Sequence, residues 1–187
     1  MKRYLKVFSI MFLCILLLNC SEKVQIDHNK DICTILKENP DWKKTLIKVH
    51  EKYKVEPEFI MALIYQESRF DAKAKSKHST AYGYAQVINK TWKHFQEDVK
   101  ANAKRDNFDD SAEFVGWYVS QLANKLKIKM TDYSNLYMAY MLGATGFKRY
   151  KNGTFKNTEK IEKDKKITLK LKGYTKEYKS QLKQCPL

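Results

Sequence analysis

Residues 57–70 have the sequence PEFIMALIYQESRF. Its apolar residues Ile60, Leu63 and Ile64 recur at i, i+3 and i+4, which is the spacing of one face of an α-helix. Pro57 stands where that helix begins, because a proline in the first helical turn loses no hydrogen bond. Glu67 follows at i+7 and falls on the same apolar face. The pattern predicts a buried helix that carries an acid.

An acid on a buried face has a predictable chemistry. Desolvation disfavours the charged form of a carboxyl group and raises its pKa. A glutamate whose pKa is raised can act as a general acid near neutral pH. Glu67 is therefore the candidate catalytic acid. The alternative is an acid at the end of a helix that points to water, and the spacing alone leaves that alternative open.

Helical spacing continues on both sides of this stretch. Asn39 and Pro40 form a helix start, with the asparagine as the cap. Apolar residues three and four apart predict further helices near residues 40–53, 89–99, 110–126 and 136–143, the last of which ends at Gly143. The tail from Thr158 contains both an alternating and a helical pattern, and we predict a helix there. With three prolines, six glycines and no internal repeat, residues 31–187 are predicted to form one all-α domain.

The N-terminus has the layout of a secretory signal. Three basic residues, Lys2, Arg3 and Lys6, precede an uncharged apolar run over residues 7–18 that is too short to span a bilayer comfortably. The run leads into Cys20, and the sequence around it resembles the lipobox at which bacterial signal peptidases cleave before an acylated cysteine. We predict a signal peptide over residues 1–19 and a lipid-anchored tether over residues 20–30. The alternative is an ordinary signal peptide that happens to contain a cysteine.

Export changes the interpretation of the other cysteines. Cys33 and Cys185 remain once the signal and the lipidated residue are set aside, one near each end of the mature domain. In an oxidising compartment such a pair is a candidate disulfide. Two free buried thiols are the alternative.

The formal net charge of +15 requires an acidic partner or a lysine-rich solvated surface. Export argues against nucleic acid as that partner, and the lysines are spread along the sequence rather than interleaved with aromatic residues in one stripe. Anionic cell-wall polymers and lipid head groups are the acidic partners of an envelope. The four histidines have no metal-ligand spacing, and we expect neither a metal nor a cofactor.

Three short motifs occur in a fixed order: QESRF at 66–70, STAYGYAQ at 79–86 and AYMLG at 139–143. In order and spacing they are similar to the Glu-Ser, Gly-x-x-Gln and Ala-Tyr-Asn-x-Gly elements of the soluble lytic transglycosylase (SLT) domain. The segment 114–118, FVGWY, resembles a lipoprotein branch of that family. The resemblance covers roughly residues 31 to 185. It implies a goose-type lysozyme-like fold with a substrate groove.

The resemblance also implies a set of site residues. Glu67 would be the catalytic acid, and Tyr140 would orient its carboxyl through a hydrogen bond. The expected substrate contacts come from all three motifs: Ser68, Tyr82, Gly83, Tyr84, Gln86 and Met141.

Each expected contact has a physical reason and an alternative. Gly83 permits a positive φ or a close approach of backbone to a sugar ring, although an ordinary turn glycine would look the same. Gln86 offers a donor and acceptors to amino sugars. Tyr82 and Tyr84 can present aromatic faces to sugars, or they can belong to the core. Met141 stands where many members carry asparagine, and methionine cannot donate a hydrogen bond to an acetamido group.

The resemblance implies cleavage of peptidoglycan between N-acetylmuramic acid and N-acetylglucosamine. One acid suffices if the substrate supplies the nucleophile, so that Glu67 acts first as acid and then as base and leaves 1,6-anhydromuramoyl ends. Two alternatives stay open: a lysozyme-like hydrolase that admits water at the same Glu67, and a glycan-binding lipoprotein without chemistry, which Met141 favours. We expect a monomer, anchored by its lipid at the periplasmic face of the outer membrane, that binds glycan strands and no nucleic acid.

Overall fold

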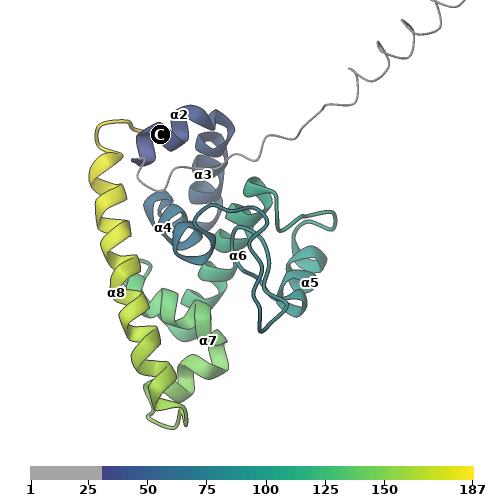
Figure 1. The fold of residues 1–187 in the computed structure, drawn as a ribbon, viewed down its shortest axis with the longest axis vertical. Helices are drawn as coiled ribbons and strands as arrows, with labels where there is room; N and C mark the ends of the chain where they lie inside the picture. Colours follow the sequence, from purple (N-terminus) through teal and green to yellow (C-terminus); the bar gives the residue numbers. More distant parts are fainter. Residues whose placement is uncertain (1–30) are drawn as a thin grey trace, which may run out of the picture.

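The computed structural model describes residues 31–187, and this part of the chain is a bundle of helices without a named strand (Figure 1). The predicted signal, the tether and Cys20 lie outside the described residues. The helices, in chain order, are α2 (Ile32–Glu38), α3 (Pro40–Tyr53), α4 (Pro57–Ser68), α5 (Asn89–Asp98), α6 (Phe108–Leu126), α7 (Tyr133–Lys151) and α8 (Thr158–Gln181). The predicted all-α fold is confirmed.

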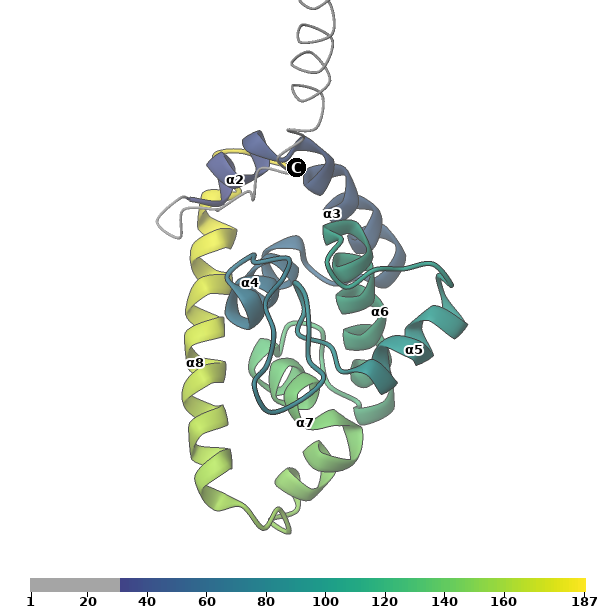
Figure 2. The ribbon, with the colours of Figure 1, turned by 45° about the vertical axis from the view of Figure 1, so that its right-hand side comes forward.

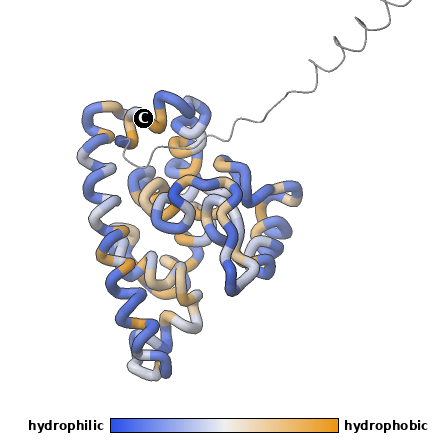
Figure 3. The backbone as a smooth tube through the Cα atoms, viewed as in Figure 1, coloured by the Kyte–Doolittle hydropathy of each residue, from blue (hydrophilic) through white to orange (hydrophobic). Residues whose placement is uncertain are grey.

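Helix α4 lies at the centre of the molecule, with α8 on one side and α3 and α6 on the other (Figure 2). Its residues from Phe59 to Ile64 are all completely buried, which explains why its sequence is apolar almost all round. Helix α8, by contrast, is mostly hydrophilic along its length (Figure 3). Only one stripe of α8, which includes Leu171 and Tyr178, is buried. The stretch that carries Glu67 is therefore the core around which the other helices pack.

The helix predicted for the tail from Thr158 is confirmed. The difference in burial between two of its leucines explains why the alternating apolar pattern of the tail does not indicate a strand. Leu171 is completely buried, whereas Leu169 is 66% exposed. A strand would have placed the two side chains on the same face. On a helix, positions two apart lie on nearly opposite sides, and the burial pattern agrees.

The prediction that the helix from 136 ends at Gly143 is confirmed by the backbone. The span labelled α7 consists of two helical segments that meet at Gly143, whose φ of 65° and ψ of 169° are not helical. A residue with a side chain rarely adopts this positive φ, so the glycine ends the first segment and places a kink before the second, which runs to Lys151.

Asn39 also differs from its prediction. It stands at the N-cap position of α3, but its side chain makes no capping bond to that helix. Its Nδ2 donates instead to the carbonyl of Ile35, at 2.9 Å, and so completes the end of α2.

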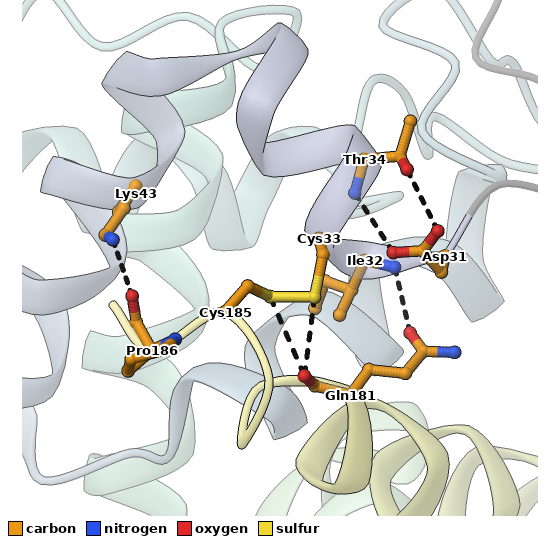
Figure 4. Close-up of a disulfide and its surroundings, with 8 residues drawn as sticks. All are labelled: Asp31, Ile32, Cys33, Thr34, Lys43, Gln181, Cys185 and Pro186. Carbon is orange, nitrogen blue, oxygen red and sulfur yellow. Dashed lines mark hydrogen bonds between the residues drawn. A yellow bond between two sulfur atoms is a disulfide. The ribbon is translucent and has the colours of Figure 1, made fainter.

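A disulfide joins Cys33 in α2 to Cys185 beyond the end of α8, with the two Cα atoms 5.7 Å apart (Figure 4). The bond closes 152 positions of chain and ties together the two ends of the described part. Two hydrogen bonds support the same corner. The Ile32 amide donates to Oε1 of Gln181 at 2.9 Å, and Nζ of Lys43 donates to the Pro186 carbonyl at 2.6 Å.

Candidate active site

Glu67 lies in the last turn of α4, one residue before the buried Ser68 at which the helix ends. Its surroundings are dense, yet the residue keeps some solvent access. Burial raises the pKa of Glu67 to about 7, against a usual value of 4.5. The predicted desolvation of this acid is confirmed. Near neutral pH its carboxyl is thus poised between the acid and base forms.

A tyrosine on α7 holds the carboxyl. The hydroxyl of Tyr137 donates to Oε1 of Glu67 at 2.8 Å. This bond favours the ionised form and opposes part of the effect of burial on the Glu67 pKa. Tyr137 is itself only 2% exposed, so its hydroxyl is fixed by the packing around it.

The prediction that Tyr140 donates this hydrogen bond is wrong. The Tyr140 hydroxyl donates to the backbone carbonyl of Ala85, at 2.7 Å, and so ties α7 to the loop that contains the second motif. The charge of Glu67 nevertheless contributes to raising the pKa of Tyr140, behind the larger effect of burial, so the two groups are near one another. Tyr137 and Tyr140 are three residues apart on one helix face, and their rings lie 6.2 Å apart. Helical spacing places both tyrosines on the same face of α7, and the resemblance to the family motif led to the prediction of Tyr140 as the partner of Glu67.

No second carboxylate acts on Glu67 from within residues 31–187. Its pKa is set by burial and by the Tyr137 bond, and no other charged group contributes to the shift. Asp164, which is buried on α8, makes a small contribution to the raised pKa of Tyr137 and is not among the groups that shift the pKa of Glu67.

The second motif forms a compact loop. Gly83 has φ 78°, as its residue type predicted, and its amide donates to the Ala74 carbonyl at 3.0 Å. A Cβ at this position would overlap the backbone carbonyl of Arg105. Gly83 is therefore needed for the contact between two backbone segments rather than for a contact with a sugar.

Gln86 also serves the loop. Its Nε2 donates to the carbonyls of Ala74 and Gly83, both at 2.9 Å. These two bonds use both hydrogens of the amide group, so in this arrangement Oε1 is the Gln86 atom that can contact an amino sugar.

Arg105 supports the loop from outside, and sequence reasoning missed it. Its Nη1 donates to the carbonyls of Thr80, at 2.9 Å, and Val87, at 2.7 Å. Its own carbonyl accepts from the amide of Tyr84 at 3.1 Å. Nothing in the local sequence marks this arginine, because its partners lie some twenty positions earlier in the chain.

The two loop tyrosines have different surroundings. Tyr84 packs edge-on against Trp42 and Phe108, and burial raises its pKa to about 12, as expected of a core residue. The Tyr82 hydroxyl donates to Asp106 at 3.2 Å. Lys75 Nζ and Arg105 Cζ lie 5.7 and 5.3 Å from the centre of the Tyr82 ring. A sugar contact of Tyr82 stays a prediction.

Ser68 and Met141 complete the expected contacts. The Ser68 hydroxyl is buried and donates to the carbonyl of Ile64 at 3.1 Å, so the structure does not present it to a substrate. Met141 is partly buried and packs beside a small cluster of Leu122, Met138, Ala139 and Phe147. This apolar position suits methionine better than the asparagine of the family pattern.

The sequence matches the protein family described as Transglycosylase SLT domain over residues 8–185. The chain belongs to this family. Transglycosylases of the SLT type cleave the glycan of peptidoglycan in the cell envelope, and the helical bundle around Glu67 agrees with their mainly α fold. No curated protein matches the chain. Within residues 31–187, no helix is both long and apolar enough to cross a membrane.

Proposed function

We propose that this SLT domain cleaves the β-1,4 bond between N-acetylmuramic acid and N-acetylglucosamine and forms 1,6-anhydromuramoyl ends. The observation that carries the proposal is Glu67, an acid with a pKa of about 7 that has a fixed tyrosine partner and no second carboxylate acting on it. A hydrolase that works through two carboxylates needs a second one close to the first, and no carboxylate of residues 31–187 contributes to the pKa shift of Glu67. A single group that changes roles needs a pKa near the working pH, which is what burial supplies.

In the first step, protonated Glu67 gives its proton to the glycosidic oxygen as the bond from that oxygen to C1 of the muramoyl sugar breaks. The acetamido group of the same sugar stabilises the positive charge at C1. In the second step, ionised Glu67 takes the proton from the C6 hydroxyl as its oxygen bonds to C1. The proton returns to Glu67 and the ring closes without water.

Tyr137 assists both steps as a positioning residue. Its hydroxyl fixes one carboxyl oxygen of Glu67, at 2.8 Å, and leaves the other oxygen to face the substrate. Because the bond favours the ionised form, it stabilises Glu67 in the interval after the proton has left. A purely apolar pocket would raise the pKa further and make the second role harder.

Product analysis tests the proposal. Purified protein is incubated with isolated sacculi, and the released fragments are identified by mass spectrometry. Anhydromuramoyl ends are the expected product. Reducing ends would show that water attacks C1 and that the domain is a hydrolase, and the absence of new ends would leave only glycan binding.

A further inference from the structure

A cavity of about 610 Å³ lies where the end of α6 meets both ends of α7, away from the residues assigned to the glycan. Its lining includes five lysines, namely Lys125, Lys127, Lys129, Lys148 and Lys151. Its other lining residues include the apolar Leu126, Ile128 and Phe147. We refer to it as the lysine cavity.

The lysines of this cavity have no acidic partners. None of the five forms an ion pair with another part of residues 31–187, and all five are exposed. The one carboxylate in the lining, Asp132, caps α7 by accepting from the amide and the side chain of Asn135, at 3.2 and 2.6 Å. The cavity therefore presents a surplus of positive charge that nothing in the described chain neutralises.

A second cavity, of about 350 Å³, provides the contrast. It also contains three lysines, but Lys52 pairs with Glu113 at 2.8 Å and Lys100 pairs with Asp110. Lysines in the last turn of a helix stabilise its negative end, which accounts for part of the basic character where α6 and α7 end. It does not account for Lys127 and Lys129, which lie beyond α6 and line the same hollow.

We propose that the lysine cavity binds the peptide portion of peptidoglycan. A short peptide with several carboxylates and small apolar side chains matches a lining that combines lysines with apolar side chains. This inference rests on the proposed function and adds to it a preference for glycan that still carries its peptides.

The position of the cavity agrees with this occupant. Asn135 lines the cavity and Tyr137 contacts Glu67; two residues correspond to about 200° around a helix, so the two sites lie on opposite sides of α7. A helix with its side chains is about 10 to 12 Å across, and a peptide of five residues extends to roughly 16 to 18 Å. A peptide on a glycan strand held at Glu67 can therefore reach around α7.

The position of the lysine cavity in the fold also favours a cell-wall ligand over a lipid head group. Helix α7 lies at the opposite end of the bundle from α2, where the described chain begins (Figure 1, Figure 2). A tether that starts at residue 30 would hold the α2 end toward the membrane. The lysine cavity would then face the cell wall.

The test compares glycan strands that carry peptides with the same strands after an amidase has removed them. One variant combines Lys127→Glu, Lys129→Glu and Lys148→Glu. The matched control combines Lys163→Glu, Lys166→Glu and Lys170→Glu, which are exposed on α8 and change the net charge equally. Binding is measured by calorimetry in a Glu67→Gln background, and kcat/KM is measured with Glu67 intact.

We expect parent and control to prefer peptide-bearing strands by roughly tenfold, since exposed ion pairs are individually weak and three of them together contribute about one power of ten in affinity. In the cavity variant this preference should disappear. Equal binding of both strands by the parent, or an equal loss in the control, would overturn the inference while leaving the proposed function intact. Failure to release anhydro ends from either strand would instead reject the proposed function. Cavity-dependent binding to anionic lipid vesicles or to a phosphate polymer, without the peptide preference, would show that the lysine cavity binds a different anionic ligand and would overturn the inference.

Discussion

Removal of a single hydroxyl group, in Tyr137→Phe, tests how the pKa of Glu67 is set. Tyr137 is buried at 2% exposure, and phenylalanine keeps its ring packing while deleting the donor that lies 2.8 Å from Oε1 of Glu67. The bond favours the carboxylate over the neutral acid. Its loss must therefore raise the pKa of Glu67.

The size of the shift follows from the bond. A hydrogen bond to a charged group contributes about 1.5 to 3 kcal/mol, and one pKa unit corresponds to about 1.4 kcal/mol. The full loss would move the pKa by about one to two units. Because Glu67 keeps some solvent access, water replaces part of the bond, and we expect a shift of about one unit.

The assay is the pH profile of kcat/KM for the release of anhydro ends, which reports the free enzyme. The first step needs protonated Glu67, so the parent rate should fall as the pH rises through about 7. In Tyr137→Phe the fall should begin about one pH unit higher, and the plateau should be lower because the carboxyl is less well oriented. Melting temperatures of both proteins exclude unfolding as the cause.

Tyr140→Phe is the matched control, because its hydroxyl donates to the Ala85 carbonyl and not to the acid. Its plateau should fall as the loop loosens, and its alkaline limb should stay near that of the parent. An alkaline limb that moves in Tyr140→Phe and stays in place in Tyr137→Phe would refute the assignment of the two tyrosines.

Three further perturbations test the remaining assignments. Glu67→Gln should keep its fold and lower the rate by two to four powers of ten, as measured by anhydro ends released, whereas a rate near that of the parent would remove Glu67 from the mechanism. Replacement of Cys33 and Cys185 by alanine should lower the free energy of unfolding by roughly 2 to 5 kcal/mol in denaturant titrations, and no loss would mean that the disulfide does not form. Cys20→Ser should abolish lipid labelling and release the protein from membranes, and a variant that still fractionates with membranes would disprove lipidation at Cys20.

Sequence patterns predicted the helices that have one clear apolar face. Helix α3 begins at Pro40, as predicted. Helix α5 begins at Asn89, the earlier of the two residues expected to cap it, Asn89 and Thr91. Helix α6 begins at Phe108, before the start expected near Asp110 or Ser111. Helix α2 was not predicted, since seven residues are two turns and show too little periodicity. These errors lie at element ends, where capping and tertiary contacts decide the boundary.

The candidate site was predictable only where local sequence determines it. Glu67 follows from an apolar helix face, and its burial is present in the structure. The partner of that acid does not follow, because Tyr137 and Tyr140 share a helix face and only the packing of α7 on α4 selects between them. The role of Arg105 could not be predicted for the same reason, because its hydrogen bonds join one loop to another.

The kink at Gly143 explains how α7 contributes residues both to the Glu67 site and to the lysine cavity. Before it, α7 brings Tyr137 to Glu67. A straight helix of 19 residues would be about 28 Å long and would carry its last two turns away from α6. The positive φ of Gly143 instead redirects the chain, so that Phe147 joins an apolar cluster that includes Leu122 of α6, and the following lysines reach the lysine cavity. The glycine that sequence patterns identify as the end of a helix therefore determines that the acid and the basic cavity flank the same element.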